Sequence, residues 1–146
     1  MSVLAHFTVK TDVTGDSMKG VSLEYSVLNF YKENGFFAVR APKSGVNTFD
    51  VLGFSDNRID VIECKQRHLE PEQPVYFTRE ELASVIAIAD KIQKLLKNVE
   101  VKAWLFFSMP RKGKRSLRTW IDLSGDFRSI KIWYDPLSDK LRVVKK

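Results

Sequence analysis

Apolar and polar positions recur with two different periods along the chain. From residue 17 to residue 34 the apolar side chains return every three or four positions, which predicts an amphipathic helix ending at Gly35. Three runs rich in β-branched and aromatic residues follow, "FFAVRA", "NTFDVLGF" and "RIDVIECK", divided by the turn-forming stretches "PKSG" and "SDN". Residues 2–10 have the pattern of a further short strand. The first half is therefore predicted to form a helix and a set of neighbouring strands.

A second helix is predicted from its start signal. Thr78 and Glu81 have the T-x-x-E spacing of a capping box, and helical apolar spacing continues from Leu82 to about Asn98. The strand "VKAWLFFS", a basic hairpin segment "PRKGKRSLRTWIDL" and two short strands around "IKIWY" and "LRVV" come next. This order predicts an α/β fold in which one central mixed β-sheet is flanked by helices.

Charged residues interrupt two of the predicted strands. Alternation in "RIDVIECK" places Glu63 and Lys65 on the same face of their strand and Cys64 on the reverse face, where it packs as a small apolar residue. Asp50 lies in the preceding run, although aspartate is disfavoured in strands. If the two runs pair about the "SDN" turn, Asp50 comes close to Glu63 and Lys65.

A third carboxylate is expected to join them from the first helix. Glu24 falls within the apolar arc of the helical wheel, so it should point toward the sheet. Three carboxylates around one point repel one another unless a cation neutralises them, and oxygen ligands suit Mg²⁺ or Mn²⁺. Such an ion would activate water against a phosphate, and Lys65 would orient that water or stabilise the developing charge. Taken singly, Glu24 could be a solvated helix residue, Glu63 and Lys65 an exposed ion pair, and Asp50 a turn cap.

Composition narrows the class of protein. Lys and Arg outnumber Asp and Glu by 24 to 18 in 146 residues, and the net charge of +6 favours nucleic acid over an anionic membrane as partner. A single cysteine, Cys64, excludes an internal disulfide framework and a multi-cysteine zinc site. No run of about 20 apolar residues and no secretory leader is found, so we expect an intracellular protein.

The spacing of these residues resembles a known family. Asp50, Glu63 and Lys65 follow the D…E-x-K signature of the PD-(D/E)XK nucleases, with Phe49 where that signature has proline. The flanking stretches "KGVSLE", "NGFFAVRAPKSG" and "PVYFTREEL", within residues 19–98, resemble those of the archaeal Holliday junction resolvases. The resemblance implies a restriction-endonuclease-like core and a metal-dependent endonuclease that cuts four-way DNA junctions as a homodimer.

The resemblance also implies roles for particular residues. Glu24, Asp50, Glu63 and Lys65 would form the active site, with Asp50 and Glu63 as the main metal ligands. The backbone carbonyl of Cys64 would supply a further oxygen ligand. The ion would be Mg²⁺, with Mn²⁺ able to substitute and no organic cofactor. Ser44 matches the active-site serine of the family.

This chain departs from the family pattern at two neighbouring positions, and the resemblance also implies where in the cell the protein works. Tyr25 and Ser26 stand where the family usually has Arg and Glu, which puts a contact there in doubt. The protein would work in the cytoplasm, associated with the nucleoid, in an archaeal cell or in a virus-infected host cell.

Basic residues outside the carboxylate set are candidate DNA contacts. The densest positive segment lies at a predicted hairpin tip around Gly113, where it either contacts phosphates or forms a solvated loop. The full expected set is Lys19, Arg40, Lys43, Ser44, Arg67, Arg111, Lys112, Lys114 and Arg115.

Two questions stay open at this point, and one expectation concerns the domain organisation. Trp120, Ile130, Ile132 and Trp133 fit either a core or a dimer patch. We expect one nuclease domain over residues 1–146, with its core at about 17–123 and a basic, short-stranded part at about 111–146. The alternatives to a junction resolvase are a related nuclease for duplexes, nicks or flaps, and a catalytically silent DNA-binding module of the same fold.

Overall fold

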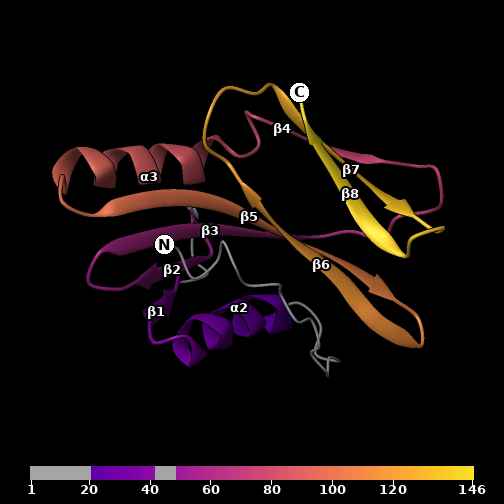
Figure 1. The fold of residues 1–146 in the computed structure, drawn as a ribbon, viewed down its shortest axis with the longest axis horizontal. Helices are drawn as coiled ribbons and strands as arrows, with labels where there is room; N and C mark the ends of the chain where they lie inside the picture. Colours follow the sequence, from indigo (N-terminus) through magenta and orange to yellow (C-terminus); the bar gives the residue numbers. More distant parts are fainter. Residues whose placement is uncertain (1–20, 42–48) are drawn as a thin grey trace.

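The computed structural model describes residues 21–41 and 49–146, and within these it contains two sheets and two α-helices. The main sheet has the strand order β1-β2-β3-β5-β6, in which β3 and β5 run parallel and the other neighbours run antiparallel (Figure 1). A central mixed sheet flanked by helices was predicted, and it is confirmed. The predicted strand at residues 2–10 and the first positions of the first helix lie outside the described residues. The elements are α2 (Val21–Glu33), β1 (Phe37–Arg40), β2 (Val51–Phe54), β3 (Arg58–Gln66), β4 (Val75–Thr78), α3 (Ala83–Leu95), β5 (Glu100–Arg111), β6 (Lys114–Asp122), β7 (Ser129–Asp135) and β8 (Lys140–Lys145).

Helix α2 ends in a Schellman motif at the glycine that the sequence indicates. Gly35 has a φ of 84°, a left-handed conformation that glycine adopts without steric cost. The N–H of Phe36 donates to the carbonyl of Tyr31 at 3.0 Å, and the N–H of Gly35 donates to that of Lys32 at 3.2 Å. The rings of Tyr31 and Phe36 pack edge to face with centroids 5.0 Å apart, which fixes the direction of the chain into β1.

The two helices cover opposite faces of the main sheet, α2 below it and α3 above it in Figure 1. On the α2 side, the fully buried Val27 and Tyr31 pack with Val51 and Ile62 of the sheet. On the α3 side, Val85 and Ala89 join a larger core cluster. The carboxylate-bearing strand β3 therefore lies in the middle of the molecule, with apolar layers on both faces.

The predicted capping box forms, but regular helix begins later than expected. The N–H of Thr78 donates to Glu81 Oε1 at 2.9 Å, and the N–H of Glu81 donates to Thr78 Oγ1 at 3.2 Å. The next residues form a turn, and α3 runs from Ala83 to Leu95 instead of reaching Asn98. The box thus closes the turn between β4 and α3.

A second, three-stranded sheet corrects the expectation of one sheet. Its order is β4-β7-β8, with both pairs antiparallel, and Figure 1 shows it above the β5–β6 hairpin. Strand β4 was not predicted, because four residues between a turn and a capping box are too few to show a period. Ile130 and Ile132 of β7 are fully buried in the α3-side core, which settles their role, and Trp120 packs against the α2-side core.

Strand ends differ from the prediction near the carboxylates and near the basic hairpin. Strand β2 begins at Val51, so Asp50 lies directly ahead of it and not within it. Strand β5 continues to Arg111, beyond the predicted strand, and turns at Gly113, whose φ is 71°. In the part of the chain described here, no helix is long and apolar enough to cross a membrane.

Candidate active site

Asp50 is fixed beside β3 by hydrogen bonds of both its backbone and its side chain. Its N–H donates to the carbonyl of Ile62 at 2.9 Å, which continues the β2–β3 ladder by one residue. Its Oδ2 accepts a hydrogen bond of 2.7 Å from the N–H of Cys64. Because a carboxylate held by a backbone amide cannot swing away, Asp50 presents its other oxygen in a defined direction.

Glu63 and Lys65 share one face of β3, as the alternation predicted. Lys65 Nζ lies 3.4 Å from Glu63 Oε2, and the two side chains are 26% and 22% exposed. The register places Glu63 across from Asp50, since Val51 pairs with Ile62 one position earlier. Two carboxylates and an ammonium therefore meet where β2 begins.

Glu24 reaches the same place from the first turn of α2. Arg40 Nη1 donates to Glu24 Oε1 at 3.2 Å, and the guanidinium carbon of Arg40 lies 4.8 Å from the centroid of the Tyr25 ring. The expected inward direction of Glu24 agrees with its side-chain exposure of 15%. Tyr25, one of the departures from the family pattern, thus stacks on the arginine that binds Glu24, a partnership that sequence spacing alone did not reveal.

The electrostatics of the site follow from this crowding. Burial raises the pKa of Asp50, and the nearby charge of Glu24 raises it further, against the N–H of Cys64 and the charge of Lys65. Burial also raises the pKa of Glu63, with the charge of Asp50 adding to the effect and Lys65 opposing it. Burial among these carboxylates raises the pKa of the Cys64 thiol well above its usual value, and Cys64 packs against the α2-side core as predicted.

The carboxylates fit a hard divalent cation. Two half-buried carboxyl groups with raised pKa values are stabilised when a cation neutralises them, and Mg²⁺ is commonly held by one or two carboxylates together with water. Asp50 and Glu63 supply that number. No group of three or more His, Cys, Asp or Glu side chains is arranged to hold a metal ion among residues 21–41 and 49–146.

The predicted DNA contacts divide into four groups. Lys19, Lys43 and Ser44 lie outside the described residues. Arg67 is exposed beyond the end of β3, with its guanidinium carbon 5.4 Å from the Phe77 ring centroid. Arg40 lies on β1 and pairs with Glu24. The remaining residues lie at the β5–β6 hairpin, where Lys112, Lys114 and Arg115 are exposed and Arg111 is partly buried.

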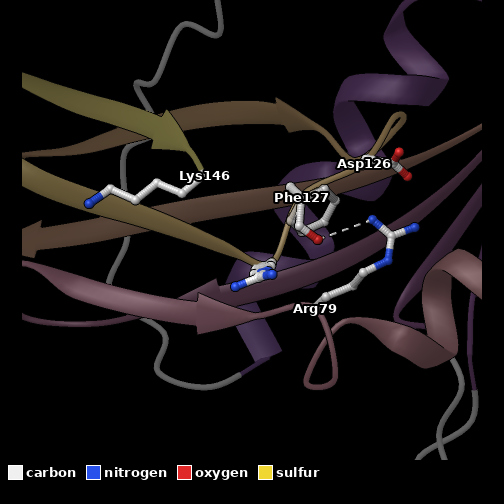
Figure 2. A pocket seen from close by; sticks show the side chains of 5 residues that line it. Arg79, Asp126, Phe127 and Lys146 are labelled. Carbon is white, nitrogen blue, oxygen red and sulfur yellow. Dashed lines mark hydrogen bonds between the residues drawn. The ribbon is translucent and has the colours of Figure 1, made fainter.

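A surface pocket whose lining contains none of the carboxylates includes an arginine that contacts the connection between β6 and β7. It is lined by Arg79, Asp126, Phe127, Arg128 and Lys146, none of which belongs to the carboxylate set. Figure 2 shows Arg79 pointing to the backbone of Phe127, to which its Nη1 donates at 3.5 Å, with a second bond of 3.0 Å to the carbonyl of Gly125. Its guanidinium carbon also lies 4.6 Å from the Phe127 ring centroid. Arg79 therefore joins the β6–β7 connection to the turn before α3.

Comparison with known families decides the class of protein. The family model described as archaeal Holliday junction resolvase (Hjc) matches residues 16–122. The chain belongs to the archaeal Holliday junction resolvase family. It is accordingly a structure-selective nuclease that resolves Holliday junctions, and its substrate is branched DNA. Nucleases of the Hjc type depend in general on a metal ion.

A solved structure supports the fold of this Hjc-family chain. The chain is similar to Hjc of Archaeoglobus fulgidus, a Holliday junction resolvase from an archaeal hyperthermophile, with a TM-score of 0.52 and 22% identity. The match covers 70% of this chain and 75% of that one, and the shared fold is restriction-endonuclease-like, as predicted. A search of curated proteins returned no match. The family match ends at residue 122, so β7 and β8 lie beyond it.

Proposed function

We propose that this resolvase hydrolyses the phosphodiester bonds of a four-way junction at Asp50, Glu63, Glu24 and Lys65. The observation that carries the proposal is the meeting of Asp50 and Glu63 at the start of β2, where burial raises both pKa values, the charge of Glu24 raises that of Asp50 further, and the charge of Asp50 raises that of Glu63 further. Asp50 and Glu63 would hold Mg²⁺, with Mn²⁺ able to substitute and the Cys64 carbonyl as a further oxygen ligand. The ion would supply an activated water and polarise the scissile phosphate.

The remaining groups of the site have distinct tasks in this proposal. The Lys65 ammonium, 3.4 Å from Glu63, is close enough to stabilise negative charge on a phosphate bound at the carboxylates. The Cys64 N–H keeps Asp50 oriented. Arg40 keeps Glu24 extended toward the sheet and places a positive charge beside the site, where DNA phosphates must pass. Ser44 and Lys43 would contact the DNA backbone near the cut.

The assembly and the location belong to the same proposal. Cutting both strands of a junction symmetrically requires two active sites, so we propose a homodimer of this 16.8 kDa chain. Residues 1–146 would act as one nuclease domain, because the α3-side core contains residues of both sheets. A DNA-resolving enzyme would work in the cytoplasm, at the nucleoid.

Cleavage of an immobile four-way junction tests the site and the substrate together. We would compare the protein, Asp50→Ala and Asp56→Ala on the junction and on linear duplex of the same arms, with Mg²⁺, Mn²⁺ or EDTA. Asp56 is an exposed aspartate of the β2–β3 turn and is the matched control. We expect paired symmetric nicks on the junction alone, absent in EDTA, and a rate for Asp50→Ala below about one hundredth of the original.

Each other outcome corrects a definite part of the proposal. Normal turnover by Asp50→Ala with intact Asp56→Ala would remove Asp50 from the site. Efficient cutting of duplex or flaps would keep the nuclease site and discard junction selectivity. Tight junction binding without any cutting, with either metal ion, would make the protein a silent binding module.

A further inference from the structure

The second sheet has one face in the core and one face directed outward. Register places Val75 and Phe77 of β4 on the same face as Ile132 and Ile130 of β7, and all four belong to or pack on the α3-side core. Because side chains alternate along a strand, the residues between them point the other way. The second sheet therefore presents a separate outer face, formed by three strands.

The outer face combines aromatic rings with cations in adjacent positions. Tyr76 pairs with Lys131, Lys131 pairs with Val144, and Trp133 pairs with Arg142. Tyr76 is 51% exposed and Val144 is 40% exposed. The Lys131 ammonium lies 5.0 Å from the centroid of the Trp133 ring. Each ring thus has a positively charged side chain beside it on the next strand or on its own.

The positive charge of this region is concentrated beyond the end of the family match. Residues 123–146 carry six Lys or Arg and three Asp, which accounts for half of the net charge of +6. On the outer face, Arg142 contacts Asp135, with Nη2 and Oδ2 3.2 Å apart, whereas Lys131 forms no ion pair with any residue in 21–41 or 49–146. A face of this composition complements a polyanion that also has flat rings to stack.

We propose that the outer face of β4, β7 and β8 binds single-stranded nucleic acid. Unpaired bases stack on Trp133 and Tyr76, which lie on neighbouring strands at diagonal positions, about 7–8 Å apart at the backbone. The Lys131 ammonium, 5.0 Å from the centroid of the Trp133 ring, contacts the phosphates. This surface is separate from the carboxylate site and binds unpaired segments of DNA or RNA.

Single strands fit this face better than a duplex does. In a duplex the base faces are stacked on one another and cannot reach a protein ring, whereas unpaired bases leave both faces free. A surface that contacts only the phosphates of a duplex uses cations and hydrogen-bond donors, and the faces of aromatic rings find no base to stack on there. The pairing of rings with cations therefore favours a single-stranded partner over a duplex.

Binding of a labelled oligothymidylate in EDTA tests the proposal without cleavage. We would measure fluorescence anisotropy for the full chain and for Trp133→Ala, Tyr76→Ala, Trp133→Phe and Lys131→Gln. Phe37→Ala is the matched control, because Phe37 is an exposed ring, 68% exposed, on β1 of the other sheet. We expect Kd to rise about ten-fold in Trp133→Ala and in Tyr76→Ala, as stacking on one ring predicts, and to stay unchanged in Phe37→Ala.

Two further readouts locate the bound strand and separate this surface from the resolvase site. Trp133→Phe keeps a ring and should bind normally, while the quenching of tryptophan fluorescence by the oligonucleotide is lost. Junction cleavage by Trp133→Phe and Tyr76→Ala should match that of the original chain, so failure of the proposed active site would leave this test standing.

The proposal is overturned by any of three results. The first is the same Kd for oligothymidylate in the two alanine variants as in the original chain. The second is unchanged quenching in Trp133→Phe. The third is a change of molecular mass in the alanine variants with unaltered binding, which would make the face a contact between copies of the chain. Thermal melts and the milder Trp133→Phe substitution keep the test valid if Trp133→Ala fails to fold.

Discussion

Asp50 and Glu63 have carboxyl groups that suit metal binding but lower the stability of the folded protein. Both have raised pKa values in the folded protein, first because they are buried and then because they repel other carboxylates. Such groups bind protons more strongly in the folded chain than in the unfolded one. Ionisation of these two groups therefore lowers the free energy of unfolding. This loss is largest above their pKa values in the folded protein and disappears below their pKa values in the unfolded chain.

Asp50→Asn should consequently raise the stability of the metal-free protein at neutral pH. The amide oxygen can still accept the hydrogen bond from Cys64, while the repulsion with Glu24 and Glu63 is removed. We expect a higher melting temperature than the original chain in EDTA at pH 7, and a difference that shrinks as the pH falls through the raised pKa. Asp56→Asn, in the exposed turn, should leave the melting temperature unchanged. A lower melting temperature for Asp50→Asn at neutral pH would contradict the repulsion.

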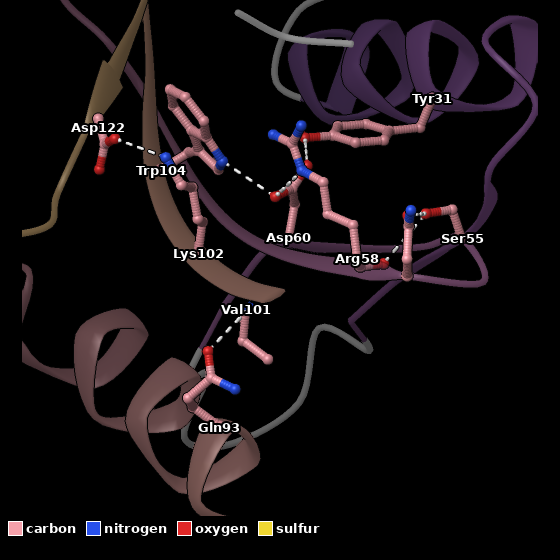
Figure 3. Close-up of polar contacts among 10 residues, drawn as sticks. Tyr31, Ser55, Arg58, Asp60, Gln93, Val101, Lys102, Trp104 and Asp122 are labelled. Atoms are coloured by element: carbon pink, nitrogen blue, oxygen red, sulfur yellow. Dashed lines mark hydrogen bonds and ion pairs between the residues drawn. The ribbon is translucent and has the colours of Figure 1, made fainter. Parts of the chain in front are cut away.

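At the scale of elements, a buried polar cluster joins α2, β3 and β5. Figure 3 shows Tyr31, Arg58 and Trp104 converging on Asp60, whose oxygens accept hydrogen bonds of 2.8, 2.9 and 3.1 Å from them. Asp60 is fully buried and Arg58 is 4% exposed, so the ion pair is shielded from bulk water. Burial raises the pKa of Asp60, against the opposing effect of Arg58 and the three donors. The cluster fixes how α2 crosses the sheet that carries Glu63.

Removing Asp60 should cost much more stability than removing one of its donors. In Asp60→Ala the Arg58 guanidinium is left buried without its counter-charge, and we expect a loss of about 3–5 kcal/mol in the free energy of unfolding. Tyr31→Phe removes only one hydrogen bond and should cost about 1 kcal/mol. Urea unfolding followed by circular dichroism gives both values. Equal losses in the two variants would show that the ion pair adds nothing beyond its hydrogen bonds.

The sequence predicted those elements whose determinants are local. The period of α2 placed Glu24 on the buried side, Gly35 marked the Schellman cap, and the short turn between β2 and β3 set the register that brings Asp50 to Glu63. Strand β4 was not predicted because its four residues form a strand only through pairing with β7, some 50 residues later. The Arg40–Glu24 contact could not be predicted either, since it depends on where α2 crosses β1.

At the scale of the whole molecule, one residue connects the basic hairpin to the second sheet. Arg111 Nη1 lies 2.8 Å from Asp139 Oδ1 in the β7–β8 turn, and its Nε donates to the carbonyl of Arg115 at 2.7 Å. Tyr134 donates to the same Asp139 oxygen at 2.8 Å. Arg111 therefore holds the hairpin against the second sheet, while Lys112, Lys114 and Arg115 extend from it with exposed side chains.

This division predicts different effects of the hairpin cations on junction binding. Changing Lys112, Lys114 and Arg115 together to Gln should weaken binding of the four-way junction and flatten the plot of log Kd against log salt concentration, by about one unit for each phosphate that the variant no longer binds. Arg111→Gln, the control, removes a charge already neutralised by Asp139 and should change the slope less. Titrations in EDTA over a series of salt concentrations measure both variants. A slope in the triple variant equal to that of the original chain would place the hairpin outside the DNA interface and leave Arg40 and Arg67 to contact the phosphates beside the carboxylates.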